Sequence, residues 1–291
     1  MAVYFALFYT EYTFLSLAFL TPLSINIEEY TESFGLFIPT EPILFGLMLL
    51  LLMQQMQKNT LANYIWKNPI IWAVGFYLFW ITITAITSSS PVTSFKFLLA
   101  RLWFIVPLLV FGTRIFINPK NIRLFIWLFC IAMCIAITYT ITVHSGYNFG
   151  EKEGHWVMWP FFKDHTIYGS TVAFSIPLII ALYFSKKHTL LMQITLIGLI
   201  TIMVTGLYFS YTRAAWLSVI LSLGVLAVIK LRIKFSILAT VAGLSLITLY
   251  FSWDAIQMEL ERNKYEHTTE EFGEKLQSAT NVTTDASNLE R

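Results

Sequence analysis

The chain has 291 residues, of which 57% are hydrophobic and only 12% are charged, and its formal net charge is +2. Ordinary soluble domains carry about 25% charged residues, so this composition excludes a soluble protein and predicts a polytopic membrane protein. The two cysteines, Cys130 and Cys134, lie in one apolar stretch, one helical turn apart. That placement fits packing better than a disulfide framework or a zinc site.

Nine apolar segments follow one another along the chain. Each is expected to be a helix, because backbone polar groups cannot remain unpaired in lipid. Most reach the roughly 20 residues that cross a bilayer core. The segments are residues 3–21, 37–56, 70–87, 97–117, 122–143, 166–184, 190–209, 214–229 and 235–253. The sequence therefore predicts an all-α transmembrane domain over residues 1–253, followed by a polar external segment over residues 254–291.

Basic residues between the segments orient the chain. Four loops, at 57–69, 118–121, 185–189 and 230–234, carry Lys and Arg in or beside them and no acidic residue. Every Asp and Glu except Glu11 falls on the other side. Basic loops remain in the cytoplasm, so we expect these loops and the amino terminus to be cytoplasmic and residues 254–291 to lie outside.

The last residues have the pattern of a helix start. Ser287 to Glu290, "SNLE", fits a capping box, and Arg291 would stand in the first turn of that helix. We expect the sequence to be a fragment that ends inside an external loop. A frayed natural terminus is the alternative.

Arg213 is a single cation between two apolar segments, in "YFSYTRAAWLSVI". It is expected at the outer turn of a tight hairpin, ahead of a segment of about 16 residues, or roughly 24 Å of helix. That length holds Arg213 near the hydrocarbon edge. There it could be an interfacial anchor, or it could grip a lipid phosphate with its planar set of donors.

Three further charges fall inside or beside apolar segments. Arg101 is expected one turn inside the outer end of the fourth segment, with Lys96 just above it. A charge inside the membrane indicates function unless it extends to the headgroups, and both readings stay open for Arg101. Glu11 falls in the middle of the first segment, where it either pairs with a buried cation or marks a misplaced helix.

The predicted external loop over residues 144–165 collects polar and aromatic side chains. Its histidines, His144, His155 and His165, lack any metal-ligand spacing, so we expect no metal. Lys163 and Asp164 precede the next segment. The Trp and Phe residues of this loop fit an interfacial belt, or alternatively a platform for a sugar or a polyprenyl chain.

The cations of the outer side form one group. Lys96, Arg101, Lys163, Arg213 and Arg291 all map to the same predicted face. A cationic cluster at the edge of the outer leaflet suits a diphosphate attached to a lipid.

Three stretches resemble one family. "SYTRAAW" (210–216) resembles the signature of the O-antigen ligase and O-antigen polymerase superfamily, where it opens the span before a large periplasmic loop. "FFKDHTIYGSTVAFSIP" (161–177) resembles an external segment of that family, and "NLER" (288–291) resembles the part of its large loop that carries a second arginine.

The resemblance implies a metal-independent glycosyltransferase of the multi-spanning GT-C type in a bacterial inner membrane, with no cofactor. Such enzymes take a glycan from undecaprenyl diphosphate at the periplasmic face. The acceptor is the lipid A core for a ligase, or a second lipid-linked glycan for a polymerase. Arg213 and Arg291 would match the two catalytic arginines, which bind the diphosphate and stabilise it as it leaves.

The predicted site has further residues, taken from the mapping of charges to the outer face, and the resemblance leaves one gap. Arg101, Lys96, Lys163, Asp164 and His165 are the candidate substrate-binding residues. The family's general-base histidine lies beyond the match, so the chain as given is expected to be inactive alone. Membrane lipid is an expected partner and nucleic acid is not.

Two other classes remain open. A transporter or lipid-carrier flippase is expected to have broken helices and polar sites at the midplane. Here the cations gather at one face instead. A non-catalytic scaffold or sensor would need neither Arg101 nor Arg213.

Overall fold

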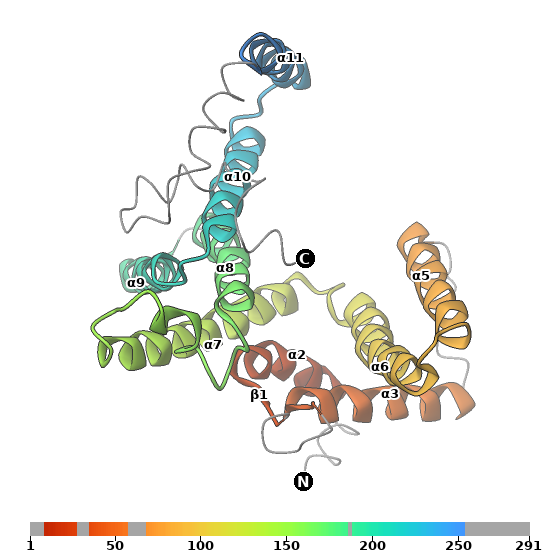
Figure 1. Cartoon of the computed structure of the whole chain (residues 1–291). Coiled ribbons are helices and arrows are strands. Elements are labelled where there is room, and N and C mark those ends of the chain that lie inside the picture. The colour runs from red at the N-terminus through yellow and green to blue at the C-terminus, as the bar shows by residue number, and fades with distance from the viewer. Residues whose placement is uncertain (1–8, 28–34, 58–67, 186–187, 254–291) are drawn as a thin grey trace.

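The computed structural model describes residues 9–27, 35–57, 68–185 and 188–253, and Figure 1 gives the arrangement of their helices. The α-helices are α2 (Thr10–Leu20), α3 (Thr40–Gln57), α5 (Pro69–Ile86), α6 (Pro91–Ile115), α7 (Pro119–Ser145), α8 (His165–Ser185), α9 (Leu190–Tyr208), α10 (Arg213–Lys230) and α11 (Phe235–Phe251). Two 3-10 turns, η1 (Thr21–Leu23) and η2 (Glu153–His155), and two short strands, β1 (Ile25–Asn26) and β2 (Phe37–Ile38), complete the described elements.

The prediction of an all-α, multi-pass membrane protein is confirmed. Six described helices, α5 to α10, are long and apolar enough to cross a membrane. Each of the nine predicted segments overlaps a described helix, and residues 3–8 of the first segment lie outside the described residues. The count of nine spans, the GT-C architecture and the orientation in the membrane stay predictions.

Local sequence explains where two of these helices begin. Asn68 and Asn118 each precede a proline, and each side chain accepts a hydrogen bond from the backbone N–H two residues later, at 2.9 Å and 3.1 Å. An Asn cap followed by proline at the first helical position is a strong start signal, because the proline lacks an N–H that would otherwise be unpaired. The chain therefore enters α5 and α7 at fixed residues.

The predicted span over 37–56 begins three residues too early. Phe37 and Ile38 form strand β2, which pairs antiparallel with β1, so that Ile25 faces Ile38 and Asn26 faces Phe37. Helix α3 starts only at Thr40, whose hydroxyl bonds that of Ser24 beside β1. Because the strand residues are apolar like the helix that follows them, hydropathy does not change between β2 and α3. The sequence therefore gives no signal for the start of α3.

Glu11 does not lie in the middle of a helix. Helix α2 begins at Thr10 after Tyr9, so Glu11 stands in its first turn, where its Oε1 accepts a hydrogen bond of 2.6 Å from Nδ2 of Asn121. The predicted mid-span position is therefore wrong. The interaction joins the starts of α2 and α7, so these two helices run in the same direction.

Helix α7 is the centre of the described fold. It packs against α2, α8 and α9, and α8 packs in turn on α9 and α10. Its buried residues, Cys130 and Cys134 among them, form a core with residues of α8, α9 and α10. Both thiols are free, as packing cysteines should be. A second core joins Phe14 of α2 to apolar residues of α3 and α6, and α5 packs on α6 in a separate arm (Figure 1).

The helices of the first core alternate in direction. At the end that we call the loop end, α7 finishes, α8 starts, α9 finishes and α10 starts, with residues 146–164 and 209–212 between them. At the opposite end, Nζ of Lys230 lies 3.4 Å from the ring centroid of Phe184, which joins the last turns of α10 and α8. The segments that the sequence assigned to one face, around residues 144–165 and 210–213, therefore share one end of the fold.

Candidate functional site

The turn that leads into α10 has a strained backbone that hydrogen bonds hold in place. Tyr211 has φ of +50°, in the left-handed region that residues with a β-carbon rarely adopt. On one side of it, the buried Ser210 hydroxyl donates to the carbonyl of Leu207 at 2.7 Å. On the other, Nε1 of Trp216 donates to the same carbonyl at 2.8 Å. The "SYTRAAW" stretch thus bonds back to the end of α9 and forms a fixed, tight turn.

Arg213 is the first residue of α10 and is half-buried. The first backbone N–H groups of a helix have no intrahelical partner and carry partial positive charge. The guanidinium therefore adds a full charge to an end of the helix that already favours an anion. This part of the sequence-based interpretation, a cation at a tight hairpin turn, agrees with the structure.

The start of α8 is capped by Asp164. Its Oδ1 accepts hydrogen bonds of 2.8 Å from the backbone N–H of Thr166 and of Ile167, and another from the Thr166 hydroxyl. Partial burial alone would raise the pKa of Asp164, but these hydrogen bonds and the nearby His165 outweigh it and hold the pKa below its usual value. Asp164 therefore stays a carboxylate and stabilises the helix start.

One hydrogen bond joins these two helix starts. The Thr212 hydroxyl, which is buried, lies 3.0 Å from the backbone carbonyl of His165 and 3.0 Å from that of Ser210. Directly below it, α8 approaches the turn at Gly169, where a β-carbon would lie 2.8 Å from Oγ1 of Thr212 and 3.0 Å from Oγ of Ser210. Only glycine allows so close an approach, so Gly169 and Thr212 fix Arg213 relative to the start of α8.

The loop between α7 and α8 closes over the same turn. The Tyr211 hydroxyl donates to the carbonyl of Phe149 at 2.9 Å. His144 is fully buried, and its Nε2 bonds the Gly150 carbonyl at 2.8 Å. Partial burial raises the pKa of Tyr211, with smaller contributions from Glu151 and Tyr208, so the phenol stays a neutral donor. His144, in the last turn of α7, thus ties the loop to the end of that helix.

The two remaining histidines of this loop lie together. The rings of His155 and His165 stack with centroids 4.1 Å apart and planes 11° from parallel. Stacked rings cannot both direct a nitrogen at one ion. Within the described residues no group of three or more His, Cys, Asp and Glu side chains could hold a metal ion.

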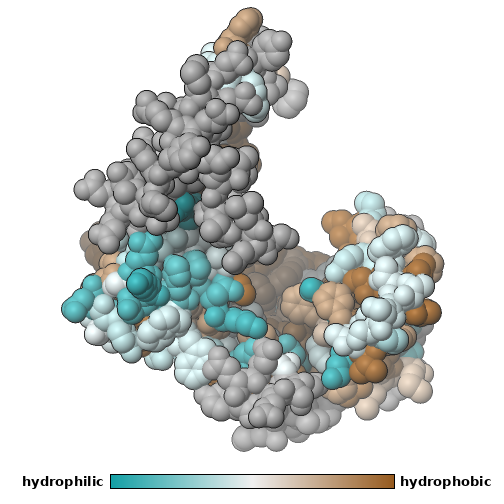
Figure 2. Space-filling view, viewed as in Figure 1, coloured by the Kyte–Doolittle hydropathy of each residue, from teal (hydrophilic) through white to brown (hydrophobic). Residues whose placement is uncertain are grey.

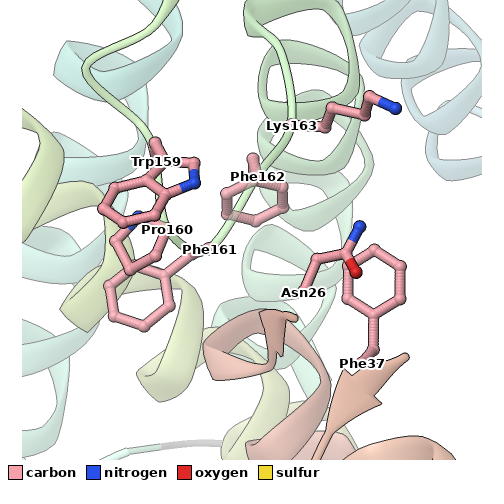
Figure 3. A pocket seen from close by; sticks show the side chains of 7 residues that line it. All are labelled: Asn26, Phe37, Trp159, Pro160, Phe161, Phe162 and Lys163. Carbon is pink, nitrogen blue, oxygen red and sulfur yellow. The ribbon is translucent and has the colours of Figure 1, made fainter. Parts of the chain in front are cut away.

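A cavity opens beside the aromatic part of the loop. Its volume is about 270 Å³, and it lies between the β1–β2 hairpin and residues 159–163. Figure 3 shows Trp159, Pro160 and Phe161 on one side of it and Asn26 and Phe37 on the other. Phe162 and Lys163 complete the lining.

The structure brings together some of the predicted site residues. Lys163, Asp164 and His165 enter α8 next to the turn that holds Arg213. Lys96 and Arg101 lie on α6, which packs on α3 and α5 rather than on α8 or α10, and the guanidinium of Arg101 lies 4.8 Å above the ring of Phe97. Arg291 falls outside the described residues. A single cluster of all five predicted cations therefore stays a prediction.

Residues that the sequence did not single out hold the site together. Thr212, Gly169 and Tyr211 fix the turn, and Asn26 and Phe37 bring the first hairpin to the loop. Tyr211, Thr212 and Gly169 stand inside the stretches 210–216 and 161–177 that resemble the family, but nothing in the sequence indicated a role for any of them. Figure 2 shows hydrophilic residues gathered over the loop end of α7 and the loop that follows it.

Comparison with known proteins adds no family to this description. No protein-family model, no curated protein and no solved structure matches the chain. The function is therefore argued from the site and from the short motifs alone.

Proposed function

We propose that the chain acts in a bacterial inner membrane as a glycosyltransferase. It transfers a glycan from undecaprenyl diphosphate to the lipid A core, as an O-antigen ligase does. The observation that carries the proposal is the hydrogen bond between Thr212 and His165. It places Arg213, in the motif that resembles the family signature, beside the segment that supplies Lys163, Asp164 and His165.

The roles follow from the chemistry of a leaving diphosphate. Negative charge grows on the diphosphate as the bond to the sugar breaks, and a guanidinium at the start of a helix stabilises that charge. Lys163 and His165 face the same substrate from the start of α8, and Asp164 keeps that start in place. Arg291 would supply the second cation of the site, whereas Lys96 and Arg101 lie on α6, which packs on α3 and α5, and they receive no role at this turn.

The proposal needs no metal and no cofactor, because the protein's own cations take the place that a metal has in other glycosyl transfers. The turn also lies at the end of two apolar helices, where a lipid headgroup lies. Charge stabilisation is larger there than in water, since the surroundings are less polarisable. The loop end would face the periplasm.

The test is deletion of the gene in the source cell, followed by a lipopolysaccharide gel and an assay of the lipid-linked glycan pool. Accumulation of long glycan on the carrier, with none on lipid A, supports the ligase. Transfer of single repeats only would make the protein a polymerase instead. An unchanged gel and an unchanged carrier pool contradict both and favour a transporter or a scaffold.

A further inference from the structure

His144 connects the loop between α7 and α8 to the turn before α10 from inside the fold. It stands in the last turn of α7, and its side chain is fully buried. Three aromatic rings pack edge-on against the imidazole. They belong to Phe149 of the loop and to Phe209 and Tyr211 of the turn, with ring centroids 5.3, 5.7 and 6.0 Å away. The imidazole therefore lies where the end of α7, the loop and the turn come together.

Two consecutive carbonyls of the loop connect this histidine to the turn. Nε2 of His144 donates to the Gly150 carbonyl at 2.8 Å, since a carbonyl can only accept a hydrogen bond. The Tyr211 hydroxyl donates to the Phe149 carbonyl at 2.9 Å. His144 and Tyr211 thus hold neighbouring residues of the loop, and a displacement of residues 149–150 moves the acceptors of both hydrogen bonds.

The backbone at both ends of the Tyr211 hydrogen bond is in an unfavourable conformation. Phe149 has φ of +55° and Tyr211 has φ of +50°. Residues with a β-carbon keep such values only where the surrounding contacts enforce them. The rings of Phe149 and Phe209 stack with centroids 4.6 Å apart, and a β-carbon at Gly154 would lie only 2.6 Å from the Tyr211 ring. The loop therefore constrains the conformation of the turn by hydrogen bonds and by close packing.

We infer that His144 is a positioning residue for Arg213, which acts through residues 149–150 and through Tyr211. Arg213 follows Tyr211 by two positions, so the contacts that hold Tyr211 also set where α10 begins. The inference rests on the proposed function for the reaction that Arg213 serves. It goes further because it gives a role to a buried histidine of α7, a helix that supplies none of the proposed site residues.

His144→Phe is the direct test, because it removes a single hydrogen bond. In the part of the chain that the structure describes, Nδ1 of His144 has no hydrogen-bond partner, so phenylalanine keeps a buried ring and loses only the bond to Gly150. The Gly150 carbonyl also accepts from the N–H of Gly154 at 3.0 Å, so it keeps a donor and the variant should fold. His144→Gln supplies an amide N–H and should restore the lost bond.

Hydrogen exchange of the purified full chain in detergent measures the turn directly. We expect His144→Phe and Tyr211→Phe each to speed amide exchange in residues 209–216 roughly fivefold, the effect of losing one hydrogen bond. The double variant should stay within about twofold of either single variant, because both bonds act through the same two loop residues. His144→Gln should stay within about twofold of wild type.

His188→Phe is the matched control. Nε2 of His188 also bonds a backbone carbonyl six positions away, that of Leu182 at 2.9 Å, but beside the last turn of α8 and away from the loop. This variant should leave exchange in residues 209–216 unchanged. Equal acceleration by His144→Phe and His188→Phe, or a double variant whose effect is the product of the two single effects, would overturn the inference.

The functional readout is glycan transfer per unit of protein, with each variant returned to the deletion strain and measured on a lipopolysaccharide gel. We expect His144→Phe to lower it roughly fivefold through misplacement of Arg213, and His144→Gln to restore it. If the loss of transfer merely followed a loss of protein level, and glutamine restored nothing, His144 would be a packing residue and the inference would be wrong.

The exchange measurement does not depend on the reaction, so the two proposals can fail separately. Unchanged exchange in His144→Phe, together with a ligase phenotype on gene deletion, rejects the positioning role alone. Faster exchange in a protein whose deletion leaves lipopolysaccharide unchanged keeps the link between His144 and the turn and rejects the proposed function.

Discussion

The hydroxyl of Thr212 donates a hydrogen bond to the backbone carbonyl of His165 over 3.0 Å, across 47 positions of sequence. It is the direct link between the first turn of α8 and the residue that precedes Arg213. Both partners sit where a helix begins, so a shift of either helix breaks the bond. The position of the proposed catalytic arginine is thereby tied to the loop that holds Lys163 and Asp164.

Replacing Thr212 with valine should uncouple the two helix starts. The variant keeps the shape of the side chain and loses its donor, so the hydrogen bond to the His165 carbonyl is lost at a cost of about 1 kcal/mol of stability. We expect a lower Tm in detergent and a reduced share of glycan-bearing lipid A in cells. Thr205→Val is the control, because that hydroxyl bonds only within α9, to the Thr201 carbonyl. Equal effects of the two variants would contradict the coupling.

Gly169→Ala should push the turn away from α8. The new β-carbon would meet Thr212 at 2.8 Å and 2.9 Å, and the overpacking should cost about 1–3 kcal/mol. Glycan transfer should fall more than protein level, which an immunoblot beside the lipopolysaccharide gel measures. At Gly198 of α9, by contrast, a β-carbon would meet nothing within 4 Å. Gly198→Ala should therefore be neutral, and a wild-type phenotype for Gly169→Ala would refute the close approach.

Asp164 should contribute to protein stability by capping the start of α8. Asp164→Ala removes the acceptor for the N–H groups of Thr166 and Ile167 and should lower stability by about 1 kcal/mol. Asp164→Asn keeps an acceptor oxygen and should lose less. Thermal unfolding of the two purified variants measures the difference. If Asn were as costly as Ala, the carboxylate would matter for its charge rather than as a cap.

The same cap predicts a pH dependence. Because the pKa of Asp164 is lowered in the folded protein, its contribution is complete above the usual Asp pKa and is lost as the pH falls through the lower, folded pKa. The difference in Tm between wild type and Asp164→Asn should therefore shrink as the pH falls below about 4. A difference that stays constant from neutral to acidic pH would show that the carboxylate is not stabilised by folding.

The helices could be predicted from the sequence because the apolar segments begin close to the Asn-Pro pairs that start two of the helices. Asn68-Pro69 and Asn118-Pro119 mark two starts in the structure within one to three residues of the predicted ones. The β1–β2 hairpin could not be read, because Phe37 and Ile38 continue the apolar run of α3. Glu11 was misplaced for a similar reason, since the start of α2 after Tyr9 leaves no gap in hydropathy.

The site was only partly readable. Charge and spacing singled out Arg213 and the segment from Lys163 to His165, and the structure brings them to one end of the fold. The contacts that join them are a hydroxyl, a glycine and a backbone carbonyl, whose pairing depends on how α8 and α10 pack. Arg101 shows what the positions of charges cannot predict. The sequence assigned Arg101 and Arg213 to the same membrane face, but α6, which carries Arg101, does not pack on α10.

The most direct test of the account is the Arg213→Lys variant of the gene, returned to the deletion strain and measured on a lipopolysaccharide gel. Lysine keeps the charge but loses the fork of donors that binds two phosphate oxygens together, so we predict transfer reduced at least about tenfold at equal protein level. Arg232→Lys, beyond the opposite end of α10, should keep full transfer. Full transfer by Arg213→Lys would contradict the proposed contact between Arg213 and the lipid diphosphate.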